Sequence, residues 1–104
     1  LKYLKTYKSF KQKPFMIDKK YEKEKAKEML ALINEYMKSS NKKPINEKLN
    51  KLADELYYKN QNKISQKMID VALAVHSFTT AAMSGGHFQD LDEFVMDLEE
   101  VIGS

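Results

Sequence analysis

The sequence predicts an all-α protein: one antiparallel four-helix bundle with an additional short amphipathic helix at its N-terminal end. Four segments place apolar residues at steps of three and four, the spacing of one face of an α-helix. Only a few turn-forming residues separate these segments, so consecutive helices are expected to fold back on one another. A chain of 104 residues with 42% hydrophobic and 32% charged residues suits a single soluble domain over 1–104.

Residues 1–17 are predicted to form a basic amphipathic helix followed by a connector. Apolar side chains fall on one side of its helical projection, and lysines fall largely on the other. These lysines, the candidate membrane or anionic contacts, are Lys2, Lys5, Lys8 and Lys11. Pro14 ends the pattern, because proline disfavours helical geometry in the residue before it. Packing on the bundle, contact with a membrane surface and a frayed terminus all stay open for this segment.

The bundle, residues 18–104, is predicted to start with a long helix over 19–40. Asp18 can cap this helix, since its side chain can accept a hydrogen bond from a free amide of the first turn. The apolar stripe consists of Ala26, Met29, Leu30, Ile33, Tyr36 and Met37. A short polar turn follows, and Pro44 is tolerated in the first turn of the next helix.

The next two helices are predicted over 45–60 and 65–84, the second with Ser65 as its cap. The stripe of the first consists of Ile45, Leu49, Leu52, Ala53, Leu56 and Tyr57. In 65–84 the apolar residues lie nearly all round the helix. Such a distribution is typical of a helix that neighbours cover on several sides, so we expect 65–84 to be the central element.

A last helix is predicted over 90–102. Gly85 or Gly86 can adopt the left-handed geometry that ends the preceding helix. Asp90 and Glu93 have the spacing of a capping box. The apolar stripe consists of Leu91, Phe94, Val95, Leu98 and Ile102. Helix termination and capping therefore account for both glycines and two of the acids, and no metal or catalytic site is needed to explain them.

No motif indicates a catalytic, cofactor-binding or metal site. The chain has no cysteine, which removes thiolate catalysis and thiolate zinc ligands. No Gly-rich phosphate loop, nucleophile elbow or HExxH pattern occurs. His87 is near Asp90 and Asp92, but His76 belongs to another predicted helix, where we expect it to be partly buried. We predict a protein that is not an enzyme, with no cofactor and no metal. The six methionines are interpreted as core residues.

Charge is divided along the chain. All eighteen basic residues are lysines that precede residue 68, where eight acids leave a net charge of +10. Residues 68–104 contain seven acids and no base, a net charge of −7. Lysines bind the phosphates of nucleic acids in a salt-dependent way that does not depend on base sequence. Because the chain has no arginine, specific recognition of bases is disfavoured. A small nucleic-acid-binding or phage or plasmid regulatory module is therefore the alternative function. A third interpretation is self-assembly through head-to-tail contact of the oppositely charged halves.

Residues 49–65, LNKLADELYYKNQNKIS, resemble the immunity proteins of pediocin-like (class IIa) bacteriocins. The similarity lies in the amphipathic pattern of this helix and in the turn at Asn62, Lys63 and Ile64, and it extends over about 26–82. The resemblance implies a four-helix bundle that protects the producer cell by engaging the bacteriocin-bound sugar-transporter receptor at the inner membrane face. In that family the C-terminal part sets which bacteriocin is recognised. Here the matching region, 87–104, is predicted to contain a capped acidic helix rather than a loose tail.

These observations favour a binding protein that neutralises a toxin or toxin-receptor complex through its last two helices and their joint. The candidate partner-binding residues are His87, Phe88, Asp90, Asp92, Glu93 and Asp97. No segment has the ~20 consecutive apolar residues of a membrane span, and no signal peptide opens the chain. We therefore expect a cytoplasmic protein, with the inner face of the membrane as its place of action. The sequence leaves the oligomeric state open.

Overall fold

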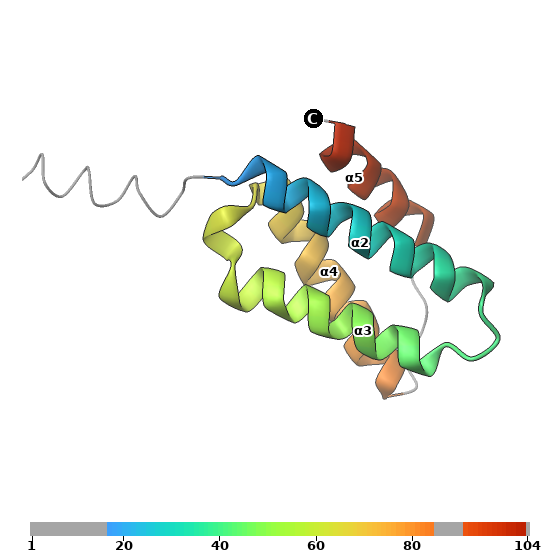
Figure 1. Ribbon diagram of the computed structural model, residues 1–104. Helices are drawn as coiled ribbons and strands as arrows, with labels where there is room; N and C mark the ends of the chain where they lie inside the picture. The colour runs from blue at the N-terminus through green and yellow to red at the C-terminus, as the bar shows by residue number, and fades with distance from the viewer. Residues whose placement is uncertain (1–16, 85–90, 104) are drawn as a thin grey trace, which may run out of the picture.

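A computed structural model describes residues 17–84 and 91–103, and in these residues it shows four α-helices and no strand (Figure 1). The helices are α2 (Lys19–Lys38), α3 (Lys43–Asp54), α4 (Gln66–Met83) and α5 (Leu91–Gly103). A π-helical turn, η2 (Glu55–Lys59), continues α3, and a 3-10 turn, η3 (Gln61–Lys63), leads into α4. The predicted all-α class with four bundle helices is confirmed. The predicted N-terminal helix, the two glycines and the Asp90 cap lie outside the described residues.

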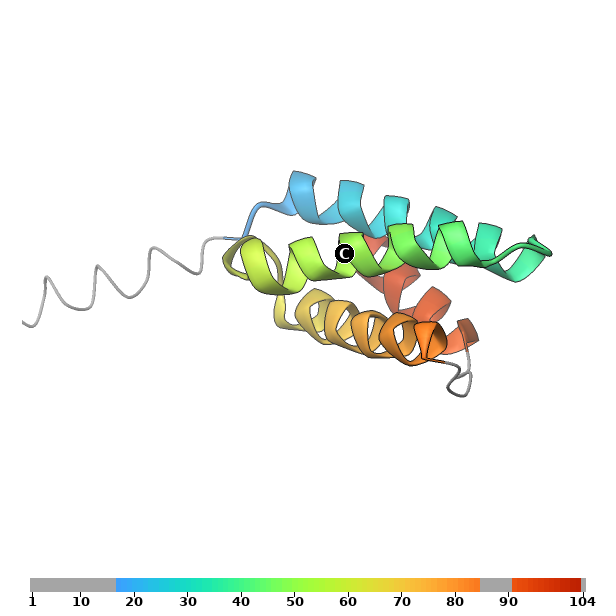
Figure 2. The same ribbon diagram turned by 90° about the horizontal axis from the view of Figure 1, so that it is seen from below.

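The helices alternate in direction and form a ring of neighbours (Figures 1 and 2). Both α2 and α4 pack on α3 and on α5. The most extensive pairings are α3 with α4 and α2 with α5. Short connections make helices that are consecutive in sequence antiparallel, as the sequence predicts. Each helix in such a ring has two flanks against neighbours, one side toward the core and one side away from it.

The first turns of α2 and α4 are capped by the predicted residues. The backbone N–H of Tyr21 donates to Asp18 Oδ1 at 3.1 Å, and that of Met68 donates to Ser65 Oγ at 3.3 Å. Each bond satisfies an amide that has no partner inside its own helix. These two caps are confirmed.

The turn between α2 and α3 is closed by a lysine. Lys42 Nζ donates to the carbonyl oxygens of Tyr36 and Ser39, at 2.7 Å in each case. It also lies 5.1 Å from the centroid of the Tyr36 ring. A cation is favourable here, because the last carbonyl groups of a helix carry partial negative charge. Pro44 lies in the first turn of α3, where its missing N–H leaves no helical bond unmade.

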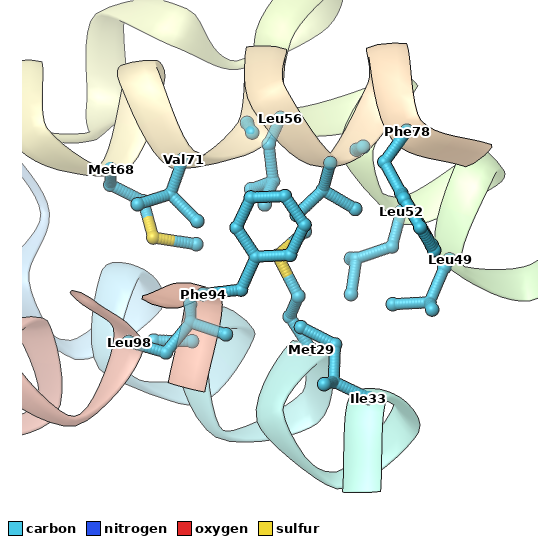
Figure 3. Close-up of a cluster of buried hydrophobic side chains, with 14 of the residues drawn as sticks. Met29, Ile33, Leu49, Leu52, Leu56, Met68, Val71, Phe78, Phe94 and Leu98 are labelled. Atoms are coloured by element: carbon cyan, nitrogen blue, oxygen red, sulfur yellow. The ribbon is translucent and has the colours of Figure 1, made fainter. Parts of the chain in front are cut away.

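The core lies between the four helices and is built mainly from the predicted stripes (Figure 3). Phe78 of α4 is 2% exposed and connects three helices through aromatic contacts. Its ring centroid lies 5.7 Å from that of Tyr36 in α2 and 6.0 Å from that of Phe94 in α5, with interplanar angles of 74°. Such edge-to-face contacts add to the free energy that burial provides.

Two interpretations of apolar residues were wrong. The helix α4 is not the central element: it packs on α3, α5 and η2, but Leu73 on its outer side is 42% exposed. The sequence showed that apolar residues surround α4, but a four-helix ring gives each helix only two flanking neighbours. The methionines are likewise not all core residues, since Met37, Met83 and Met96 are 41%, 54% and 67% exposed.

A buried glutamate joins the start of α4 to α2. Glu22 is 1% exposed, and its Oε2 accepts a hydrogen bond from the backbone N–H of Ser65 at 2.6 Å. In a capping box this acceptor comes from the third residue of the same helix, but in α4 that residue is Met68. Glu22 supplies the missing acceptor from α2, and its carboxylate also lies at the positive end of the α4 dipole.

Tyr21 is the centre of a polar cluster at the same end of the bundle. Its hydroxyl donates to Glu55 Oε2 at 3.0 Å and accepts from Asn60 Nδ2 at 2.7 Å. The Nζ atoms of Lys25 and Lys63 lie 5.7 Å and 5.5 Å from the centroid of its ring. Burial, together with the hydrogen bond to Glu55, raises the pKa of Tyr21 to about 12.

This raised pKa predicts a loss of stability at high pH. Tyr21 titrates near its ordinary value of about 10 in the unfolded chain and near 12 in the fold. Its contribution is therefore complete below about pH 10 and is lost as the pH rises toward about 12. The free energy of unfolding in urea, measured from pH 9 to pH 12, is expected to fall more steeply for the natural chain than for Tyr21→Phe. Parallel curves would show that Tyr21 is not responsible.

Candidate functional site

Three of the six predicted partner-binding residues, Asp92, Glu93 and Asp97, lie on α5 in the described part of the chain. The other three, His87, Phe88 and Asp90, lie outside it. The predicted membrane or anionic contacts Lys2, Lys5, Lys8 and Lys11 also lie outside the described residues. The candidate site is therefore built on α5.

One side of α5 anchors the helix, and the opposite side faces outward. Phe94, Leu98 and Val101 are buried in the core. Val101 was missing from the predicted stripe, although it stands three residues after Leu98 and so shares its side of the helix. This anchoring determines which residues of α5 are exposed and can contact a partner.

The outward side of α5 carries an exposed methionine among carboxylates. Met96 is 67% exposed. Side chains three and four positions apart are neighbours on a helix surface, so four acids surround it: Asp92, Glu93, Glu99 and Glu100. All four are exposed. We call Met96 and these four acids the acidic ring.

Lys67 of α4 borders the acidic ring. Its Nζ lies 2.9 Å from Glu100 Oε2 and 3.6 Å from Asp97 Oδ1. The hydrogen bond to Glu100 raises the pKa of Lys67 above its ordinary value. These side chains are solvated, so the pairing adds little to stability. Asp97 accordingly lies at the α4 edge of the site, whereas Asp92 and Glu93 lie beside Met96.

The sequence prediction missed Met96, Glu99 and Glu100. Met96 was interpreted as a core residue, and Glu99 and Glu100 were not among the candidate partner-binding residues. Their spacing along the helix could have identified these three residues as one exposed group. The four acids stand at −4, −3, +3 and +4 from Met96, which is itself two residues from the buried Leu98.

A groove of about 510 Å³ opens between α2 and α3. Apolar side chains and both signs of charge line it: Glu28, Ala31, Leu32, Glu35, Lys48, Lys51, Leu52 and Glu55. Lys25 partly bridges it, since its Nζ lies 3.6 Å from Glu55 and 4.0 Å from Glu28. A groove with this mixture of charges does not offer the continuous positive surface that phosphate groups need.

Two general features of the described residues complete the description. In 17–84 and 91–103, no three His, Cys, Asp or Glu side chains are placed to hold a metal ion. None of the helices in these ranges combines the length and the apolar character of a membrane span.

Comparison with known proteins returned no relative. No protein-family model matches the chain, and neither a curated protein nor a solved structure matches it. The candidate site therefore rests on the geometry and charge of α5.

Proposed function

We propose that the protein is a non-catalytic binding protein that receives a cationic partner on the acidic ring. The exposed Met96 at the centre of four carboxylates carries the proposal. A methionine side chain is flexible and adapts to partner surfaces of different shape. Charged residues around an apolar contact select a partner of the opposite charge and raise the rate at which it associates. The surface of the partner that would fit the acidic ring has an apolar residue between lysines or arginines.

The resemblance to class IIa immunity proteins supports a specific form of this function. In that form the protein protects the producer cell, and the acidic ring engages a cationic surface of the bacteriocin-receptor complex at the inner face of the membrane. The acidic ring falls within 87–104, the region that the resemblance associates with recognition of the bacteriocin.

Protection of a sensitive strain tests this form. We expect cells that express the protein to survive at least one member of a panel of class IIa bacteriocins that kills the parent strain. Met96→Lys is expected to abolish the protection, because it places a cation where the partner's cations bind. Met37→Lys is the matched control, since Met37 is an exposed methionine on α2. No protection against the whole panel would remove the immunity form.

Binding of a defined probe tests the acidic ring itself. The probe is a synthetic helical peptide with a leucine face flanked by lysines. We expect Met96→Lys to weaken its affinity by roughly fivefold or more, the effect of losing a central contact worth over about 1 kcal/mol. Binding should also weaken as salt is added. Equal affinity for the natural chain and Met96→Lys would exclude the acidic ring as the contact.

The alternative function, nucleic-acid binding, has one observation in its favour. Lys20, Lys27 and Lys38 are exposed on the outward side of α2. They stand seven and eleven residues apart, spacings that return to the same side of a helix. A gel shift that is present at low salt and lost at moderate salt would favour this function. No shift even at low salt would remove it.

A further inference from the structure

The helix α5 is the acidic surface of the bundle. Among the four helices that the structure describes, α5 has five acids and no base, whereas α2, α3 and α4 all contain lysines. Lys67 of α4 pairs with Glu100 and Asp97, so α5 keeps an excess of negative charge. This excess attracts cations, whereas the exposed Lys20 and Lys27 of α2 repel them. A basic segment that packs on the bundle is therefore directed to α5.

Residues 1–16, which we call the basic segment, have the opposite composition. They contain five lysines and no acid. In the predicted helix, Leu4 and Tyr7 are three residues apart and share one side. Lys8 is four residues after Leu4, and Lys11 is four residues after Tyr7, so these two lysines border the apolar side. The basic segment thus has apolar residues beside lysines, the pattern that fits the acidic ring.

The first turn of α2 and the last turns of α5 lie at the same end of the bundle (Figure 1). Both helices contact the beginning of α4. The backbone N–H of Ser65 donates to Glu22 of α2, and Lys67 pairs with Glu100 of α5. Because the basic segment directly precedes α2 in the sequence, it is attached to the bundle at the end where α5 finishes.

The chain between the predicted helix and α2 is long enough for a contact with α5. The chain enters α2 at Asp18, whose backbone N–H donates to the carbonyl oxygen of Lys63 at 2.9 Å. Residues 11–16 can span up to about 20 Å when extended. Met96 stands seven residues before the end of α5, about 10 Å along the helix axis. The predicted helix can therefore lie along the outward side of α5 and antiparallel to α2, as helices joined by a short connection do.

We propose that the basic segment packs on the acidic ring of its own chain, with Leu4 and Tyr7 against Met96 and with Lys8 and Lys11 among the carboxylates. Attachment to the bundle gives the segment an effective concentration in the millimolar range, so a weak contact is sufficient to populate the packed form. The segment then covers the surface that a cationic partner needs, and the partner must displace it. This competition rests on the proposed function, whereas the contact itself does not.

A spin label on the basic segment tests the contact in the full chain. The chain has no cysteine of its own, so Ser9→Cys can carry a single nitroxide, on the side of the predicted helix away from Leu4 and Tyr7. We expect the nitroxide to broaden the NMR amide signals of Met96 and its neighbours on α5 more than those of Lys48 and Lys51 on α3. Added salt should reduce this difference.

Two pairs of charge reversals give a matched comparison. Lys8→Glu combined with Lys11→Glu should abolish the selective broadening on α5, because it places acids beside the acidic ring. Lys2→Glu combined with Lys5→Glu makes the same change in net charge on the other side of the predicted helix, so most of the broadening should remain. Met96→Lys should reduce the broadening, since it removes the apolar contact and adds a cation.

Four outcomes would overturn the proposal. The broadening is absent or is strongest on α3, or it persists when Lys8 and Lys11 are both reversed. Broadening of an isotopically labelled natural chain by a separate spin-labelled chain would assign the contact to a second copy. Binding of the basic segment to vesicles that contain anionic lipid, with no broadening on α5, would assign it to a membrane surface.

The peptide with a leucine face flanked by lysines tests the competition. We expect it to bind the variant with Lys8 and Lys11 reversed at least about threefold more tightly than the variant with Lys2 and Lys5 reversed, because only the first exposes the acidic ring. Equal affinity for the two variants would contradict the competition. If the peptide binds neither variant while α5 is selectively broadened, the proposed function fails and the contact of the basic segment stands.

Discussion

Replacement of Phe78 by alanine is expected to lower the free energy of unfolding by about 3–5 kcal/mol. Phe78 is 2% exposed, and its ring contacts Tyr36 and Phe94 edge to face. The substitution removes a large apolar side chain from the core and leaves a cavity. It also breaks two aromatic contacts between α4 and its neighbours. Urea unfolding followed by circular dichroism measures the change.

A control on the same helix separates this effect from a general sensitivity of α4. Leu73→Ala truncates an exposed side chain and is expected to change the free energy of unfolding by less than about 1 kcal/mol in dilute solution. The aromatic contact itself can be isolated by combining Phe78→Ala with Phe94→Ala, for which we expect a coupling of about 0.5–1.5 kcal/mol. Equal losses for Phe78→Ala and Leu73→Ala would contradict the placement of Phe78 in the core.

Replacement of Glu22 by alanine is expected to lower the free energy of unfolding by about 1–3 kcal/mol. The reason is the partly buried N–H of Ser65, which loses its acceptor when the buried Glu22 carboxylate is removed. Glu22→Gln keeps an oxygen acceptor of the same reach, so its loss should be smaller. The comparison of the two variants in urea unfolding therefore measures the hydrogen bond rather than the volume of the side chain.

Hydrogen exchange gives a local test of the same contact. In Glu22→Ala, the amide of Ser65 should exchange faster than in the natural chain by more than the change in global stability explains. Amides in the middle of α4 should follow the global change. If Glu22→Gln is as unstable as Glu22→Ala, the charge at the α4 dipole, and not the hydrogen bond, is the main contribution of Glu22.

The four helices and two of their caps could be predicted from the sequence because they depend on local interactions. Asp18 and Ser65 cap amides three residues away, and the apolar stripes repeat within single helices. The bond between Glu22 and Ser65 could not be predicted, because it joins residues 43 positions apart. The outward side of α4 was missed for a related reason: a periodic pattern identifies apolar residues but not the number of neighbouring helices.

The candidate site was predicted only in part. Asp92 and Glu93 were named because charge is visible in a sequence, whereas Met96 was assigned to the core on the usual behaviour of its residue type. Whether Met96 is a core residue or an exposed contact depends on which side of α5 packs on the bundle. Once Leu98 is known to be buried, the exposure of Met96 follows from helical geometry.

The contact between Glu22 and Ser65 makes the beginning of α4 depend on a helix made much earlier in the chain. In a fragment that contains only α3 and α4, the first turn of α4 would lack one of its two side-chain contacts and would fray, because helix initiation is the unfavourable step. The last half of the bundle therefore acquires its full helical length only after α2 has docked. Folding of α2 and α4 is in this way cooperative, although the whole of α3 lies between them in the sequence.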